Sequence, residues 1–122
     1  MTLRRETVDR SRGGVWPWLG QRVTAVLVLV TIGVHLVLTH YIALGELSYD
    51  NIAERLGAGA VLVNDVVLLV AVVFHGLNGV RMVALDYAFA NAGARRALNA
   101  VLIVIGAAGI AFGVWALWVW VS

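Results

Sequence analysis

Five ionisable side chains stand within or beside long apolar stretches of this 122-residue chain: His35, His40, Asp65, His75 and Arg81. An ionisable group at membrane depth is costly to bury, so each one is a candidate functional residue by default. An imidazole can do redox chemistry indirectly, because it is a common axial ligand of haem iron. The same imidazole can instead form a hydrogen bond to a neighbouring helix and do no chemistry.

His75 has the surroundings that a haem ligand needs. Gly76 follows it and Gly79 stands one helical turn further on. Both lack a side chain, so a flat group or another helix can approach closely. Arg81 lies six residues beyond His75, and its guanidinium group suits the propionates of a porphyrin. The pattern leaves two interpretations open, which are an axial haem ligand and a histidine that is hydrogen-bonded between packed helices.

The other polar residues at membrane depth are less distinctive. His40 lies near the expected outer boundary, where it can reach water, and His35 lies deeper in the same stretch. For His35 the alternatives are a second haem ligand and a hydrogen bond to a neighbouring helix. Asp65 stands beside Asn64 near the start of the next stretch. We expect a solvated or capped carboxylate there, with a proton pathway as the alternative.

Three apolar stretches must position these residues, at about 23–43, 60–85 and 97–121. Each exceeds the ~20 residues that a membrane-spanning helix requires. The chain is 61% hydrophobic and 13% charged, with a mean hydropathy of +0.90, which is too apolar for a soluble domain of this size. The sequence therefore predicts an all-α membrane protein with three transmembrane helices. A single anchor domain is expected over 1–122, with an amino-terminal tail at 1–14.

The nine basic residues are all arginines, and their distribution predicts the orientation of the chain. Arginines collect on the cytoplasmic side of membrane proteins. Three spans put eight of them on one side, so the amino terminus is expected in the cytoplasm and the carboxyl terminus outside. Because topology accounts for the positive charge, no nucleic-acid partner is expected. The eight are Arg4, Arg5, Arg10, Arg12, Arg22, Arg81, Arg95 and Arg96; Arg55 lies on the other side.

The segment 75–87 resembles the second-helix motif of the membrane-anchor subunits of succinate dehydrogenase, respiratory complex II. That motif has a histidine, a glycine four residues on, and an Asp–Tyr pair eleven and twelve residues on. His75, Gly79, Asp86 and Tyr87 match it. The Asp–Tyr pair favours the smaller hydrophobic anchor over the cytochrome b subunit.

Two further segments extend this resemblance to about residues 15–121. Residues 21–25 resemble the start of the first anchor helix, and residues 45–49 resemble the outer loop that follows it. The chain has no cysteine, so it holds no iron–sulfur cluster, disulfide or thiolate metal site of its own. Catalysis of succinate oxidation by this chain alone is therefore not expected.

The resemblance implies an anchor subunit of succinate:quinone oxidoreductase in the cell membrane, the inner or plasma membrane. The expected partners are a flavoprotein subunit, an iron–sulfur subunit, a second three-helix anchor that completes the bundle, and membrane lipid. The resemblance implies that His75 is an axial ligand of one haem b shared with the second anchor, with Gly79 and Arg81 in the haem pocket. Quinone, the substrate, is expected to contact Tyr87, Asp86 and Arg22.

Three alternatives remain open at this stage. Some anchors in the wider family hold two haems, and His35 is then the expected outer ligand. A stand-alone diheme cytochrome b would need oligomers, because the chain has only three histidines. A small membrane protein without redox function, such as a transporter or an assembly subunit, would have His75 packed against another helix.

Overall fold

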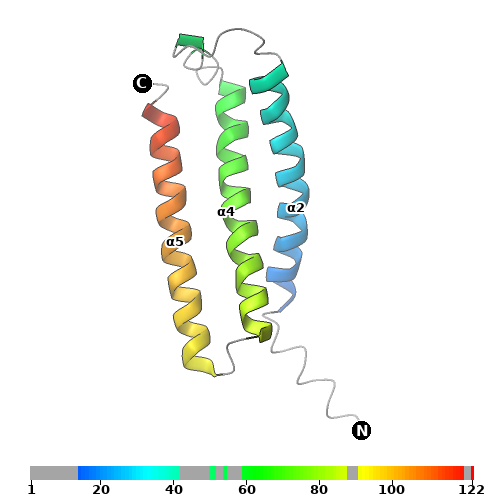
Figure 1. Cartoon of the computed structure of the whole chain (residues 1–122), viewed down its shortest axis with the longest axis vertical. Helices are drawn as coiled ribbons and strands as arrows, with labels where there is room; N and C mark the ends of the chain where they lie inside the picture. The colour runs from blue at the N-terminus through cyan, green and yellow to red at the C-terminus, as the bar shows by residue number, and fades with distance from the viewer. Residues whose placement is uncertain (1–13, 42–49, 52–53, 55–58, 88–90, 120–121) are drawn as a thin grey trace.

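The computed structural model describes residues 14–41, 50–51, 54, 59–87, 91–119 and 122. Within them the fold consists of helices and contains no strand, as expected (Figure 1). The amino-terminal tail 1–13 and the outer-loop segment 45–49 lie outside the described residues. The elements are α2 at Val15–Leu36, the π-helical turn η1 at Val37–Tyr41, α4 at Gly59–Tyr87 and α5 at Ala92–Val119.

All three long helices are long and apolar enough to cross a membrane. α2 begins at Val15, well before the apolar stretch that was expected from residue 23. Pro17 is compatible with this early start, because the first helical turn has no intrahelical partner for its N–H groups. The helix thus carries the polar residues Gln21 and Arg22 at its amino-terminal end.

α4 lies between α2 and α5, and neighbouring helices run in opposite directions (Figure 1). We call the end where α2 begins, α4 ends and α5 begins the proximal end, and the opposite end the distal end. Few side chains are buried among the described residues, and Ala71 is the one buried apolar residue. Large side chains such as Leu29, 72% exposed, and Ile103, 69% exposed, must therefore face lipid or partner subunits.

The two helix interfaces are built differently. Side-chain hydrogen bonds cross between α2 and α4. The α4–α5 interface includes the Arg81–Asn99 hydrogen bond but relies mainly on glycine. A Cβ atom on Gly106 would lie 2.9 Å from Leu77 Cδ1, and one on Gly113 would lie 2.6 Å from Leu69 Cδ2. Small residues of this kind allow two helices to approach closely where hydrophobic exclusion from water does not drive them together.

Candidate functional site

The His75 side chain points from α4 toward α2. Its Nδ1 atom lies 3.3 Å from Thr24 Oγ1. The single proton of the Thr24 hydroxyl is already donated to the Gly20 carbonyl at 2.7 Å, so the hydroxyl oxygen accepts the Nδ1–H of His75. This contact selects one imidazole tautomer, in which Nε2 keeps its lone pair. A ligating histidine is commonly held in this way, with one ring nitrogen bonded to a neighbour and the other free for a metal.

A polar cluster fixes the two helices beside His75. Gln21 donates its Nε2–H to the His75 carbonyl at 3.2 Å. The buried Asn78 donates to Gln21 Oε1 at 2.8 Å and to the Pro17 carbonyl at 3.0 Å. Gly79 takes part through its lack of a side chain, because a Cβ atom there would lie 3.2 Å from Gln21 Nε2. Gly79 therefore keeps α2 close to the turn that carries His75.

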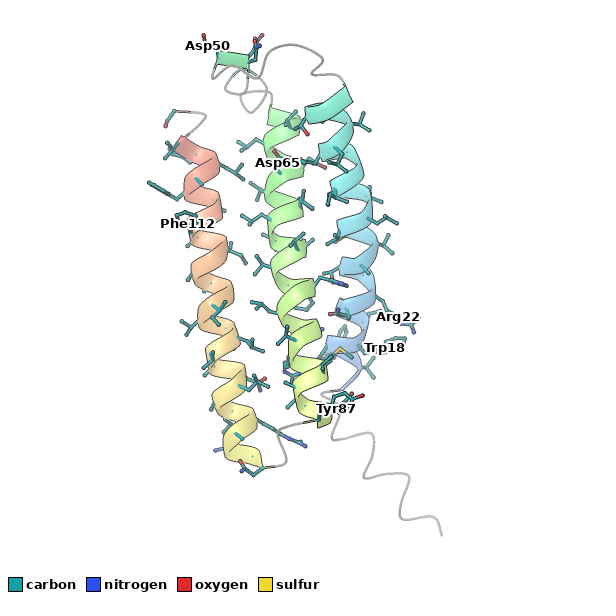
Figure 2. All side chains as sticks on the ribbon, viewed as in Figure 1. Trp18, Arg22, Asp50, Asp65, Tyr87 and Phe112 are labelled. Carbon is teal, nitrogen blue, oxygen red and sulfur yellow. The ribbon has the colours of Figure 1, made fainter. Side chains whose placement is uncertain are left out.

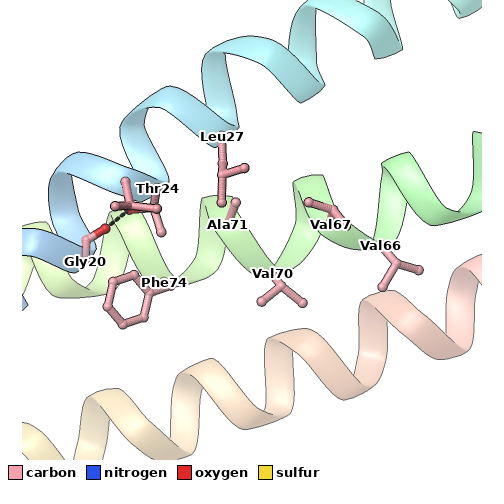
Figure 3. Close-up of a pocket in the computed structure, with 9 residues that line it drawn as sticks. Gly20, Thr24, Leu27, Val66, Val67, Val70, Ala71 and Phe74 are labelled. Atoms are coloured by element: carbon pink, nitrogen blue, oxygen red, sulfur yellow. Dashed lines mark hydrogen bonds between the residues drawn. The ribbon is translucent and has the colours of Figure 1, made fainter.

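An apolar groove of about 440 Å³ lies between α2 and α4 beside this cluster (Figure 3). Thr24 is the one polar side chain in its wall, and it is also the residue that holds His75. The groove suits a flat or chain-like apolar group. The lining residues are Gly20, Val23, Thr24, Leu27, Val66, Val67, Val70, Ala71 and Phe74.

A second polar pair crosses the same interface nearer the distal end. His35 Nδ1 lies 2.9 Å from Asp65 Oδ1, with side-chain exposures of 35% and 10%. Asn64 supports the pair, since its Nδ2 donates to the Thr31 carbonyl at 3.2 Å and lies 3.4 Å from Asp65 Oδ1. Of the two states expected for Asp65, solvated or capped, the solvated one is therefore wrong, because its oxygen has hydrogen-bond partners. The carboxylate is buried and contacts His35 of the neighbouring helix; Figure 2 labels Asp65 on α4.

Arg81 lies on a different side of α4 from His75. Its Nε donates to Asn99 Oδ1 on α5 at 2.6 Å, whereas His75 bonds to α2. The two residues that the sequence grouped around one porphyrin thus face different helices.

The residues expected to bind quinone lie at the proximal end. Tyr87 is 87% exposed and Asp86 is exposed. The Arg22 guanidinium stacks over Trp18, with 4.3 Å to the ring centroid, a favourable cation–π contact. Figure 2 shows Tyr87 at the same end of the bundle as Arg22 and Trp18. No hydrogen bond joins Tyr87 to Arg22 within the described part of the chain.

The histidines were identifiable from the sequence, but most of their hydrogen-bond partners were not predicted. Gln21 and Thr24 are three residues apart on one helix, as are His75 and Asn78 on the other. Polar residues at this spacing share one helical face. Two such pairs in otherwise apolar stretches were the available signal for a polar contact between the first two spans.

Comparison with known proteins identifies the family to which the chain belongs. The sequence model of the family described as succinate dehydrogenase/fumarate reductase transmembrane subunit matches residues 3–114. The chain is 34% identical over 79 residues to a succinate dehydrogenase hydrophobic membrane anchor subunit of Archaeoglobus fulgidus, covering 65% of each chain. It is 25% identical over 81 residues to the succinate dehydrogenase 2 membrane subunit SdhC of Mycobacterium tuberculosis, covering 66% of this chain and 60% of that one.

The matches span 60 to 65% of the length of these two curated relatives. No solved structure matches the chain. The predicted resemblance to the anchors of complex II is confirmed by the family match, which extends over most of the sequence. The chain belongs to the family of succinate dehydrogenase/fumarate reductase transmembrane subunits.

Proposed function

We propose that this chain is a membrane-anchor subunit of succinate:quinone oxidoreductase, the smaller of two anchors. In this role it helps to bind haem b and to form the site where quinone receives electrons from the iron–sulfur subunit. The observation that carries the proposal is the Thr24–His75 contact. It lies within two membrane-spanning helices of a chain whose family anchors this enzyme.

His75 is the proposed axial ligand, and the donor set around it fits that role. Thr24 accepts the Nδ1 proton, so Nε2 is the nitrogen with a free lone pair. Gln21 holds the backbone of the same turn through the His75 carbonyl. Gly79, which has no side chain, allows α2 to lie close to the turn of α4 that carries His75. A haem held here would supply one-electron storage, and His75 would be the residue of this chain that holds its iron.

The proximal end supplies the proposed quinone surface. Tyr87 is twelve residues beyond His75, or about 18 Å along a helix, so ligand and quinone site lie at different depths. The Tyr87 phenol donates a hydrogen bond to a quinone carbonyl oxygen, where it stabilises the negative charge that develops on reduction. Arg22 adds positive charge near the same end, and Asp86 is placed to exchange protons with water. Two electrons and two protons convert quinone to quinol.

The charge distribution supports a cytoplasmic proximal end. This end of the helices carries Arg22, Arg81, Arg95 and Arg96. The bias of arginine toward the cytoplasm predicts such a cluster on the cytoplasmic side. The cell membrane is the proposed location. The exposed apolar faces of all three helices suit a second anchor and lipid, and the exposed proximal end suits the iron–sulfur subunit, which in turn carries the flavoprotein.

The first test is a reduced-minus-oxidised visible spectrum of the complex isolated through a tag on this chain. The expected result is a b-type haem signal, together with co-purified flavoprotein and iron–sulfur subunits. A colourless preparation would contradict the haem assignment. Purification without the hydrophilic subunits would contradict the anchor function itself.

The quinone assignment is tested separately by Tyr87→Phe. We expect quinone reduction to fall about tenfold, the value of roughly one hydrogen bond in the transition state, while the haem spectrum is unchanged. Tyr41→Phe, at the distal end of the same bundle, is the matched control and should turn over normally. Normal quinone turnover in Tyr87→Phe would remove that residue from the site.

A further inference from the structure

Arg81 has a charge that the described residues leave uncompensated. Its Nε donates to Asn99, but its Nη1 atom is buried and has no hydrogen-bond partner within the described part of the chain. The buried Asp65 carboxylate, which contacts His35, lies far along the bundle from Arg81. A buried cationic donor without a partner is costly, so a ligand from outside the described chain is expected.

The surroundings of Arg81 form a groove between α4 and α5. Its volume is about 320 Å³. Arg81 and Asn99 supply the polar part of this groove, and Asn78, which also borders it, already donates to α2. The rest of the wall is apolar and comes from Phe74, Leu77, Leu102 and Ile103. A ligand that fits must therefore combine an anionic group with a hydrocarbon portion.

The depth of this groove along the helices narrows the choice of ligand. Arg81 lies six residues before the end of α4 at Tyr87, and Asn99 lies seven residues after the start of α5 at Ala92. At the helical rise both are about 10 Å from the proximal helix ends, the level where lipid headgroups meet acyl chains. Arg96, near the start of α5, is exposed and does not line this groove.

We propose that the Arg81–Asn99 groove binds the phosphate of an anionic membrane lipid, with an acyl chain along Leu77, Leu102 and Ile103. Asn99 accepts a hydrogen bond from Arg81 Nε, so the other two guanidinium nitrogens of Arg81 remain for the phosphate. Arginine binds phosphate through paired, charge-assisted hydrogen bonds. A haem propionate is the competing anion. The opposite directions of His75 and Arg81 favour lipid.

The test uses the intact complex, delipidated in detergent and then titrated with phosphatidylglycerol, with phosphatidylcholine as the neutral lipid and inorganic phosphate as the free anion. We expect phosphatidylglycerol to raise the thermal transition, and neither of the other two to do so. In Arg81→Gln the lipid concentration for half the effect should rise about tenfold, the value of one charge-assisted hydrogen bond. Arg96→Gln removes the same charge from an exposed site and should behave like wild type.

Two results would overturn the proposal. One is an equal response of Arg81→Gln and wild type to phosphatidylglycerol, and the other is loss of haem from Arg81→Gln with lipid binding intact, which assigns the residue to a propionate. If Arg81→Gln does not assemble, Arg81→Lys and Asn99→Ala replace it. Lysine keeps the charge without the planar fork, and Asn99→Ala releases the guanidinium. Both should weaken the lipid response, and an undiminished response in both would equally reject the site.

Discussion

Two histidines are held across the same α2–α4 interface, one near each end, by partners of different chemistry. His75 on α4 is held by the Thr24 hydroxyl of α2, and His35 on α2 is held by the Asp65 carboxylate of α4. In each pair the contact is made by Nδ1. The two sites thus make the same kind of contact with the roles of α2 and α4 exchanged, and they differ chiefly in the charge of the partner.

That difference concerns the partner and not the nitrogen that is left free. In both pairs Nδ1 faces the partner, so an imidazole that donates from Nδ1 keeps its Nε2 lone pair. The Thr24 hydroxyl is a neutral acceptor, whereas the Asp65 carboxylate is buried and needs a donor. We therefore keep one haem as the main proposal, with His75 as the ligand from this chain and His35 as a link between helices. A second haem on His35 is the alternative that the first prediction tests.

The largest expected effect comes from removing either imidazole and counting haem. His75→Ala should abolish the b-type signal of the isolated complex, because the iron loses one axial ligand. His35→Ala should leave the same haem per complex as wild type. The measurement is haem per copy of this chain, from the pyridine haemochrome spectrum. A loss of half the haem in His35→Ala would show that the two sites are equivalent and would establish two haems.

The fold was predictable from the sequence because span length and apolar composition leave few choices. Three apolar stretches in a chain with 13% charged residues indicate three membrane helices without any knowledge of packing. The start of α2 was harder to predict, since Trp16 and Trp18 precede the apolar stretch and lie in the first turn of the helix, whose backbone N–H groups have no partner within the helix.

The partners of the site residues could not be predicted to the same degree. His75 was identifiable because an imidazole far from either end of a span is unusual. The match of His35 with Asp65 depends on the rotation and axial register of two helices, and periodicity within one helix does not determine either. The same limit applies to Arg81. Its position six residues after His75 led us to expect both residues around one haem, whereas Arg81 faces α5.

A smaller effect is expected on the stability of the subunit when one member of the His35–Asp65 pair is removed. His35→Leu leaves the Asp65 carboxylate buried with Asn64 as its remaining side-chain partner, and it should destabilise the subunit by about 1–3 kcal/mol. His35→Leu combined with Asp65→Leu should recover part of that loss, because no unpaired charge remains.

The measurement is the thermal transition of the purified complex for both single variants and the double variant. Coupling between polar side chains in membrane proteins averages only about 0.6 kcal/mol. A clearly larger coupling would support a charged pair. Strict additivity of the two single variants would contradict a direct contact between His35 and Asp65.

The smallest expected effect, and the sharpest test of the Thr24–His75 pair, comes from Thr24→Val. Valine keeps the shape of threonine and removes the oxygen that accepts the Nδ1 proton, so His75 should still bind haem with a less fixed ring. We expect a haem content near wild type, a shifted midpoint potential and a dissociation of haem that is faster by roughly fivefold, the equivalent of about 1 kcal/mol for one neutral hydrogen bond. Thr24→Ser restores the hydroxyl and should reverse both changes. If Thr24→Val and Thr24→Ser were indistinguishable from wild type in potential and in haem loss, Thr24 would contribute packing alone, and its hydroxyl would have no part in holding the His75 ring.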